Sequence, residues 1–164
     1  MATAIEELYR QDFFAWTRDQ ARQLRELKEA RPNIPLDLEH LAEEVESLGL
    51  SDLRRVRSQV RRIIEHLLKL EHSPSKEPRG TWRESVLDAR VDIGDVMTRT
   101  LRNELEAEFV SLYAPARKRA AMGLVDHGER EAADALPAEC PYSLDDVMGD
   151  DWYPASRHGF VDPE

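Results

Sequence analysis

The pattern of apolar and polar positions is clearest between Leu36 and His72. Apolar residues recur there at steps of three and four, which places them on one face of an α-helix. The pattern breaks once, at Gly49-Leu50-Ser51, where glycine can end one helix and serine can begin the next. We therefore predict two antiparallel helices joined by a tight glycine turn, with their apolar stripes packed together. The stripes are Leu38, Leu41, Ala42, Val45 and Leu48 before the turn, and Leu53, Val56, Val60, Ile63, Ile64 and Leu67 after it.

Helical periodicity also extends on both sides of this pair. Pro32 and Pro35 separate the pair from the helix before it, because proline cannot continue a helix. Pro115 should kink the last long helix for the same reason. Ser143 followed by Asp146 resembles a capping box, which indicates one short helix near the end. The remaining long helices are predicted over residues 12–30, 81–97 and 100–120, and the side chain of Asp12 can cap the first of them.

These elements define the predicted fold class. It is all-α: a single-domain helical bundle of four to five long helices plus a short C-terminal helix. At 164 residues, with 41% hydrophobic and 34% charged residues, the chain has the size and composition of one soluble globular domain. We expect residues 1–136 to form the bundle and residues 137–164 to form an acidic segment packed on it, with the last residues irregular.

Charge is unevenly distributed along the chain. The net charge is −10, and the residues from Asp134 onward carry −7 of it. An acidic balance disfavours nucleic acid as a partner, because phosphate neutralisation dominates that kind of binding. Trp152 and Tyr153 give the acidic segment apolar area, so we predict that it docks on the bundle.

The single cysteine, Cys140, allows no intrachain disulfide and no cysteine-based zinc cluster. The beginning of the chain has neither the basic stretch nor the apolar core of a signal peptide. No apolar run approaches the about 18 residues that a membrane-spanning helix needs. We therefore expect a cytoplasmic protein without a membrane partner.

The order of these elements and several short motifs resemble a bacterial family known as domain of unknown function 29. The similarity covers roughly residues 8 to 150. The resemblance implies a helical bundle and implies no activity, cofactor or catalytic residue. The matching pieces are Leu8-Tyr9, Asp12 to Trp16, Leu38, Glu43 to Gly49, His66 to Lys69, Trp82-Arg83 and Pro137 to Leu144.

A polar seam is the first candidate site. Glu44 and His66 lie at the flanks of the two predicted stripes, so a hairpin would bring them together. Arg83 and Arg90 fall inside the apolar arc of the next helix, where a buried arginine needs a carboxylate or a bound anion. The four side chains, Glu44, His66, Arg83 and Arg90, are read as a structural ion-pair seam or as an anion pocket. The Glu-x-x-His repeat of di-iron bundles is absent, so we expect no metal site and no cofactor.

A basic face is the second candidate. It lies opposite the apolar stripe of residues 53–67 and is read either as a solvated surface or as a phosphate-binding one. No aromatic side chain interleaves with its charges, which weakens the case for nucleic acid. The acidic C-terminal segment is another candidate to cover this face. The residues of the basic face are Arg54, Arg55, Arg61, Arg62 and Lys69.

The function that these observations favour is a non-enzymatic, cytoplasmic helical-bundle module that acts through a protein partner or through self-association. The chain has no glycine-rich phosphate loop, nucleophile elbow or His-Glu-x-x-His motif, so whether it is an enzyme stays open. The first alternative is an enzyme or anionic-ligand-binding bundle that uses the polar seam. The second is a regulatory nucleic-acid binder that uses the basic face.

Overall fold

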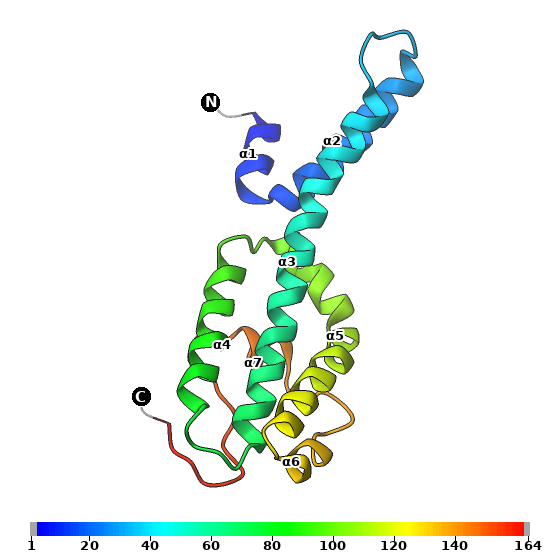
Figure 1. Ribbon diagram of the computed structural model, residues 1–164. Coiled ribbons are helices and arrows are strands. Elements are labelled where there is room, and N and C mark those ends of the chain that lie inside the picture. The colour runs from blue at the N-terminus through cyan, green and yellow to red at the C-terminus, as the bar shows by residue number, and fades with distance from the viewer. Residues whose placement is uncertain (1–2, 163–164) are drawn as a thin grey trace. The chain divides into compact units, whose positions relative to one another are not determined.

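The computed structural model describes residues 3–162, and regular structure in that range is entirely helical (Figure 1). Four helices are long and three are short, so the predicted all-α fold with four long helices and a short C-terminal helix is confirmed. The helices are α1 (Ala4–Gln11), α2 (Phe13–Ala30), α3 (Leu38–His72), α4 (Arg79–Gly94), α5 (Arg99–Asp126), α6 (Arg130–Asp134) and α7 (Leu144–Met148).

The predicted glycine turn is wrong, because α3 continues through Gly49 as one helix of 35 residues. The left-handed backbone that a glycine turn requires occurs, within residues 3–162, only at Gly128 and Gly159. Gly49 instead lets a neighbouring helix approach closely. A Cβ atom at this position would lie 2.2 Å from the Oγ1 atom of Thr17 and 3.1 Å from the Phe14 ring. The absent side chain is therefore a packing feature.

The chain forms two compact units, which are described separately. The first unit comprises the residues up to Val56 together with Val96–Leu105. In it, α2 and the first half of α3 form an antiparallel hairpin (Figure 1). Small side chains bring the two helices together, because Thr17, Ala21 and Ala42 are fully buried. Phe14, Leu38, Leu53 and Val56 complete this core.

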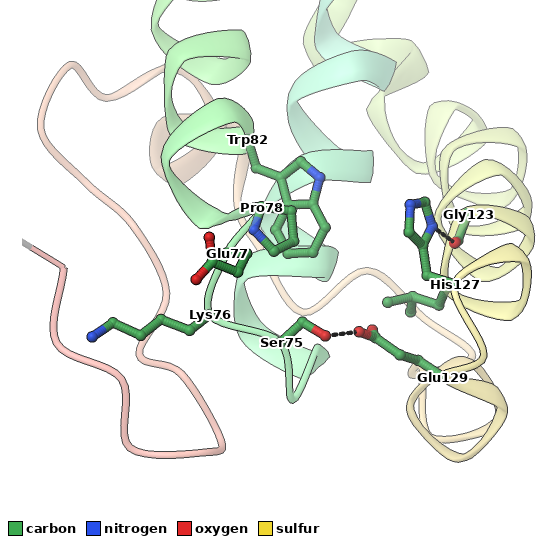
Figure 2. Close-up of a pocket in the computed structure, with 9 residues that line it drawn as sticks. Ser75, Lys76, Glu77, Pro78, Trp82, Gly123, His127 and Glu129 are labelled. Carbon is green, nitrogen blue, oxygen red and sulfur yellow. Dashed lines mark hydrogen bonds between the residues drawn. The ribbon is translucent and has the colours of Figure 1, made fainter.

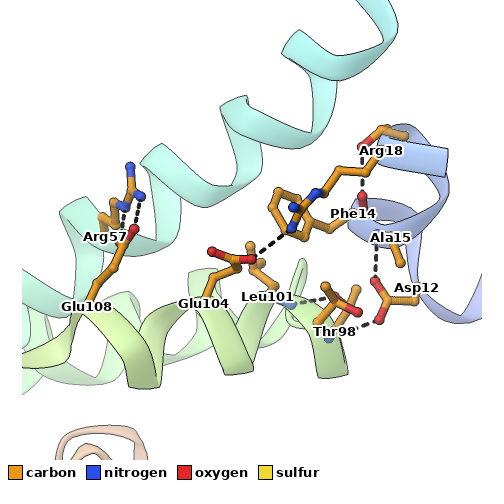
Figure 3. A network of polar contacts seen from close by, with 11 residues as sticks. Asp12, Phe14, Ala15, Arg18, Arg57, Thr98, Leu101, Glu104 and Glu108 are labelled. Atoms are coloured by element: carbon orange, nitrogen blue, oxygen red, sulfur yellow. Dashed lines mark hydrogen bonds and ion pairs between the residues drawn. The ribbon is translucent and has the colours of Figure 1, made fainter. Parts of the chain in front are cut away.

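The predicted cap at Asp12 is confirmed, and it also joins two segments of the first unit (Figure 3). One carboxylate oxygen of Asp12 accepts from the backbone N–H of Ala15 at 3.0 Å. The other accepts from the N–H of Thr100, at the start of α5, at 3.0 Å. Arg18 and Glu104 form a second link between α2 and α5, with 2.8 Å between their charged atoms.

The second unit comprises Arg57–Asp95 and the residues from Glu106 onward. The later half of α3 lies at its centre, between α4, which it meets through Gln59 and Asp92, and α5, which it meets through Glu65 and Arg119 (Figure 1). Each fully buried leucine or isoleucine there contributes about 1.5–3 kcal/mol relative to an exposed one. The helix α5 continues through Pro115. The central core side chains are Val60, Ile63, Ile64, Leu67, Leu68, Val86, Ile93, Ala116, Ala120 and Leu124.

Candidate functional site

The structure divides the predicted polar seam. Glu44 and His66 lie roughly six turns apart on the same continuous helix, so the hairpin that would have joined them does not exist. Glu44 belongs to the first unit and is exposed, whereas His66, Arg83 and Arg90 belong to the second. Of the four, the structure brings Arg83 and Arg90 together, because both guanidinium groups lie over the ring of Tyr153, at 4.6 and 5.0 Å from its centre.

Arg90 is buried and donates hydrogen bonds to backbone carbonyl groups of the C-terminal segment. Its guanidinium donates to the carbonyl oxygens of Asp146, Val147, Asp150 and Trp152 at 2.8–3.2 Å. Burial lowers the pKa of Arg90, although an arginine keeps its charge at any physiological pH. Four of the five N–H donors of this side chain bond the segment, so Arg90 holds the segment in place.

Two further arginines of α4 also contact the C-terminal segment. Arg79 donates two hydrogen bonds to the carboxylate of Asp162, at 2.9 and 2.6 Å, and a third to the carbonyl of Leu70 at 2.6 Å. Arg83 lies 3.5 Å from the same carboxylate. The guanidinium groups of Arg79 and Arg83 together hold the pKa of Asp162 below its usual range. The acidic segment therefore contacts the arginines of α4, whereas the sequence left the basic face as one candidate for such a contact.

The basic face is also divided. Arg54 and Arg55 are exposed in the first unit, while Arg61, Arg62 and Lys69 belong to the second. Lys69 is 12% exposed and its ammonium group lies 2.7 Å from the carboxylate of Glu65. It runs beneath α5, where a Cβ atom at Gly123 would come within 2.9 Å of it.

Arg61 and Arg62 line a concave site with His66, and we call this site the basic cleft. It lies between α3 and α5, has a volume of about 420 Å³ and is lined mainly by polar atoms. Sequence reasoning missed its α5 residues, because nothing in the spacing of Arg119 indicates which helix it faces. The lining residues are Ser58, Arg61, Arg62, Glu65, His66, Pro115 and Arg119.

The imidazole of His66 has a defined tautomer in this cleft. Its Nδ1 atom lies 2.8 Å from the backbone carbonyl oxygen of Arg62. A carbonyl can only accept, so Nδ1 carries the proton and Nε2 is the atom that gains one at lower pH. Burial lowers the pKa of His66, the carboxylate of Glu65 opposes that shift, and the charges of Lys69 and Arg62 add to it.

A second cleft lies around Trp82 (Figure 2). It has a volume of about 530 Å³ and a mostly apolar lining. Three of its polar side chains are engaged: Glu129 accepts from the hydroxyl groups of Ser73 and Ser75, and the Nδ1 atom of His127 lies 2.7 Å from the carbonyl of Gly123. This cleft suits an apolar group and shows no pair of nucleophile and base.

Apolar side chains are also exposed on the hairpin of the first unit. Leu27, Leu41 and Leu48 are 38%, 43% and 54% exposed, and Leu24 is half-buried beside them. The exposure of Leu41 and Leu48 corrects the prediction that both lie in a buried stripe. We call these four residues the leucine face.

The ion pairs of the hairpin show that the leucine face lies on one side of it. Arg25 of α2 bonds Glu46 of α3 at 2.8 Å. In helical projection, the buried stripe of α2 has Leu24 and Leu27 on one side and Arg25 on the other. Leu41 and Leu48 lie likewise across the stripe of α3 from Glu46. Antiparallel helices bring matching sides together, so the four leucines share the side opposite the ion pairs.

Two kinds of site are not found in the described part of the chain. Among residues 3–162, no three histidine, cysteine, aspartate or glutamate side chains are grouped as metal ligands would be. In the same range, no helix combines the length and apolar character that crossing a bilayer needs. Cys140 is half-buried, and burial raises the pKa of its thiol.

Comparisons with known proteins agree on the fold. The model of the family described as Domain of unknown function DUF29 matches residues 8–153. A crystal structure at 1.45 Å resolution of an α-helical protein of unknown function from Rhodospirillum rubrum is similar to this chain, with a TM-score of 0.75 and 29% sequence identity. The match covers 88% of this chain and 90% of that one. A comparison with curated proteins gave no match. The chain belongs to the DUF29 family.

Proposed function

We propose that this protein is a non-catalytic helical module that self-associates through the leucine face. The observation that carries the proposal is the exposure of Leu27, Leu41 and Leu48 on one side of a two-helix hairpin. Single exposed leucines are ordinary on a protein surface, whereas an aligned set on adjacent helices is typical of an interface.

The helix α1 covers the start of α2 on the same side of the hairpin as the leucine face. Its Tyr9 packs edge-on against Phe13 and Trp16 of α2, with ring centres 5.6 and 4.9 Å apart. Phe13 and Trp16 project from the same side of α2 as Leu24. Thus α1 covers the first turns of that side, whereas Leu27 further along α2 is 38% exposed.

A second copy of the chain suits the leucine face for two reasons. Two hairpins that meet through such faces form a four-helix bundle, which buries an apolar stripe that a lone hairpin leaves exposed. The groove beside Leu24 and Leu27 is also nearly neutral, because Gln20 and Gln23 line it and its carboxylate, Glu26, is paired with Arg22 at 2.7 Å. The α2 half of the face therefore presents little net charge to an identical copy.

Sedimentation equilibrium of the full chain tests the proposal. We expect the wild type to form dimers at micromolar concentration and the double variant L41E/L48E to be monomeric, because buried glutamates without partners oppose association. Val110→Glu is the control, since Val110 is an equally apolar, 85% exposed residue of the second unit. A wild type that stays monomeric at about 100 μM would exclude self-association.

We also propose a cytoplasmic location. The support is chemical: one cysteine in the whole chain allows no stabilising intrachain disulfide, which is ordinary in a reducing compartment. Fractionation of cells that express the untagged chain at natural levels tests this location.

A further inference from the structure

We propose that the basic cleft between α3 and α5 binds a dianionic phosphoryl group, either free phosphate or the phosphate of a small metabolite. Self-association through the leucine face does not involve this cleft. The cleft belongs wholly to the second unit and its volume is in the range of small-molecule sites.

The first argument concerns unpaired positive charge. Arg61 and Arg62 both line the cleft, and neither is among the ion-paired side chains within residues 3–162. Other arginines of the second unit, such as Arg57, Arg79 and Arg83, do have carboxylate partners. A guanidinium group matches a tetrahedral phosphate well, because two parallel N–H groups can bond two oxygens.

The second argument concerns Glu65, the carboxylate of the cleft. Its side chain is 13% exposed and contacts two cations, the ammonium of Lys69 at 2.7 Å and the guanidinium of Arg119 at 3.5 Å. Lys69 offsets part of the charge of Glu65, so the carboxylate only partly cancels the charges of Arg61 and Arg62. It also draws the otherwise exposed side chain of Arg119 toward the cleft.

The third argument concerns donors that complement the arginines. Ser58 contributes a hydroxyl group to the lining. His66 has its Nδ1 proton committed to the carbonyl of Arg62, so Nε2 becomes a donor once it is protonated. Pro115 closes the α5 side with a ring that has no N–H group. Arginine, serine and histidine donors around one concave site favour a compact oxyanion over an extended polymer.

Binding should depend on pH through His66. The charged groups that face it are Arg61, Arg62, Glu65 and Lys69 from α3 and Arg119 from α5. In the free protein, burial lowers the pKa of His66, so its neutral form dominates above neutral pH. A bound dianion favours the imidazolium form. Binding therefore takes up a proton, and affinity rises as the pH falls through the pKa of His66.

Calorimetric titration of the full chain with inorganic phosphate, sulfate and ribose 5-phosphate tests the proposal. We expect Arg61→Gln and Arg119→Gln each to weaken phosphate binding about tenfold or more. Arg54→Gln and Lys118→Gln are the matched controls, because each removes the same charge from the same helix outside the cleft. Glu65→Gln should tighten binding even where it lowers the melting temperature, which separates a ligand site from a purely structural cluster.

Sulfate stays a dianion across the accessible pH range, so it isolates the proton taken up by the protein. Its affinity should rise between about pH 8 and about pH 6 in the wild type and stay level in His66→Gln. Stronger binding of ribose 5-phosphate than of phosphate would identify a metabolite site, and equal binding would identify a free-phosphate site.

Three results would overturn the proposal. The first is no heat and no thermal stabilisation with any probe at about 10 mM and low salt. The second is equal loss of binding in the cleft variants and in their controls. The third is tighter binding of a single-stranded oligonucleotide than of ribose 5-phosphate, with loss in Arg54→Gln as well, which would indicate a diffuse basic surface.

Discussion

Individual residues in this protein are placed by what surrounds them more than by their intrinsic preferences. Gly49 illustrates this. Its type and position suggested a turn, yet its backbone is helical and the missing side chain leaves room for Thr17. A glycine inside a helix costs about 1 kcal/mol relative to alanine, so close packing against α2 must outweigh that cost.

Gly49→Ala should therefore destabilise the protein, although alanine favours helix. The added Cβ atom would lie 2.2 Å from Oγ1 of Thr17, so the hairpin must shift, at about 1–3 kcal/mol. Gly80→Ala in α4 is the control, because nothing lies within 4 Å of its Cβ position, and it should stabilise by up to about 1 kcal/mol. Thermal unfolding of both variants measures the difference. Equal effects would show that Gly49 is not a contact residue.

Tyr113 provides a prediction about pH at the same scale. Its hydroxyl donates to the carbonyl of Pro137 at 2.6 Å, and burial raises its pKa to about 12. A folded-state pKa above the unfolded value of about 10 gives stability that is complete below pH 10 and is lost as the pH rises toward 12. The melting temperature should fall in that window, and Tyr113→Phe should reduce the fall. An unchanged alkaline profile in the variant would contradict the assignment.

At the scale of helices, α3 shows what periodicity determines and what it leaves open. The steps of three and four identified α-helix correctly on both sides of Gly49, and Asp12 and Ser143 were correctly recognised as caps. The number of helices in that stretch was predicted wrongly. The sequence Gly-Leu-Ser only weakly favours the end of a helix. The packing of Thr17 against Gly49, two residues far apart in the sequence, outweighs that preference and keeps the helix continuous.

Hydrogen exchange can test the continuity of α3. Each amide between Ser47 and Leu53 has a helical carbonyl partner four residues earlier if the helix is continuous, so all should be protected. A turn at Gly49 would leave several of these amides exchanging within seconds. Fast exchange confined to residues 49–52 would therefore restore the hairpin interpretation.

The same reasoning explains which site residues were foreseeable. Arg61, Arg62 and His66 were each singled out from the sequence, although in two separate candidate sites, the basic face and the polar seam. Arg119 was not, because it reaches the basic cleft from α5 and only tertiary packing determines which helices meet. Arg83 and Arg90 were singled out as arginines that need partners, and the structure places their partners in the C-terminal segment.

At the scale of the whole molecule, the C-terminal segment is an integral part of the second unit. Tyr142 packs inside it and donates to Glu71 at 2.6 Å, and burial raises the pKa of Tyr142 well above its usual range. Further along, the backbone N–H of Arg157 donates to the carbonyl of Glu71 at 2.9 Å. The acidic segment is thus held by specific hydrogen bonds to α3 and α4.

Arg90→Leu should release this segment. The change leaves carbonyl groups of residues 146–152 without donors and should cost about 2–4 kcal/mol. Limited proteolysis should then cut between residues 137 and 153 at a protease concentration that leaves the wild type intact. Arg54→Leu, an exposed change on α3, should leave the cleavage pattern unchanged. Equal resistance of the wild type and Arg90→Leu would show that other contacts suffice.

The bonds of Arg90 also bear on the order of events during synthesis. The ribosome makes the chain at about 5–20 residues per second from its beginning, so α3, α4 and α5 emerge well before residues 146–152. Until then, the guanidinium of Arg90 has none of the carbonyl partners that accompany its burial. The first unit has all its segments once Leu105 has emerged. The nascent chain is therefore expected to fold in two stages, with the second unit closing only after residues 146–152 have emerged.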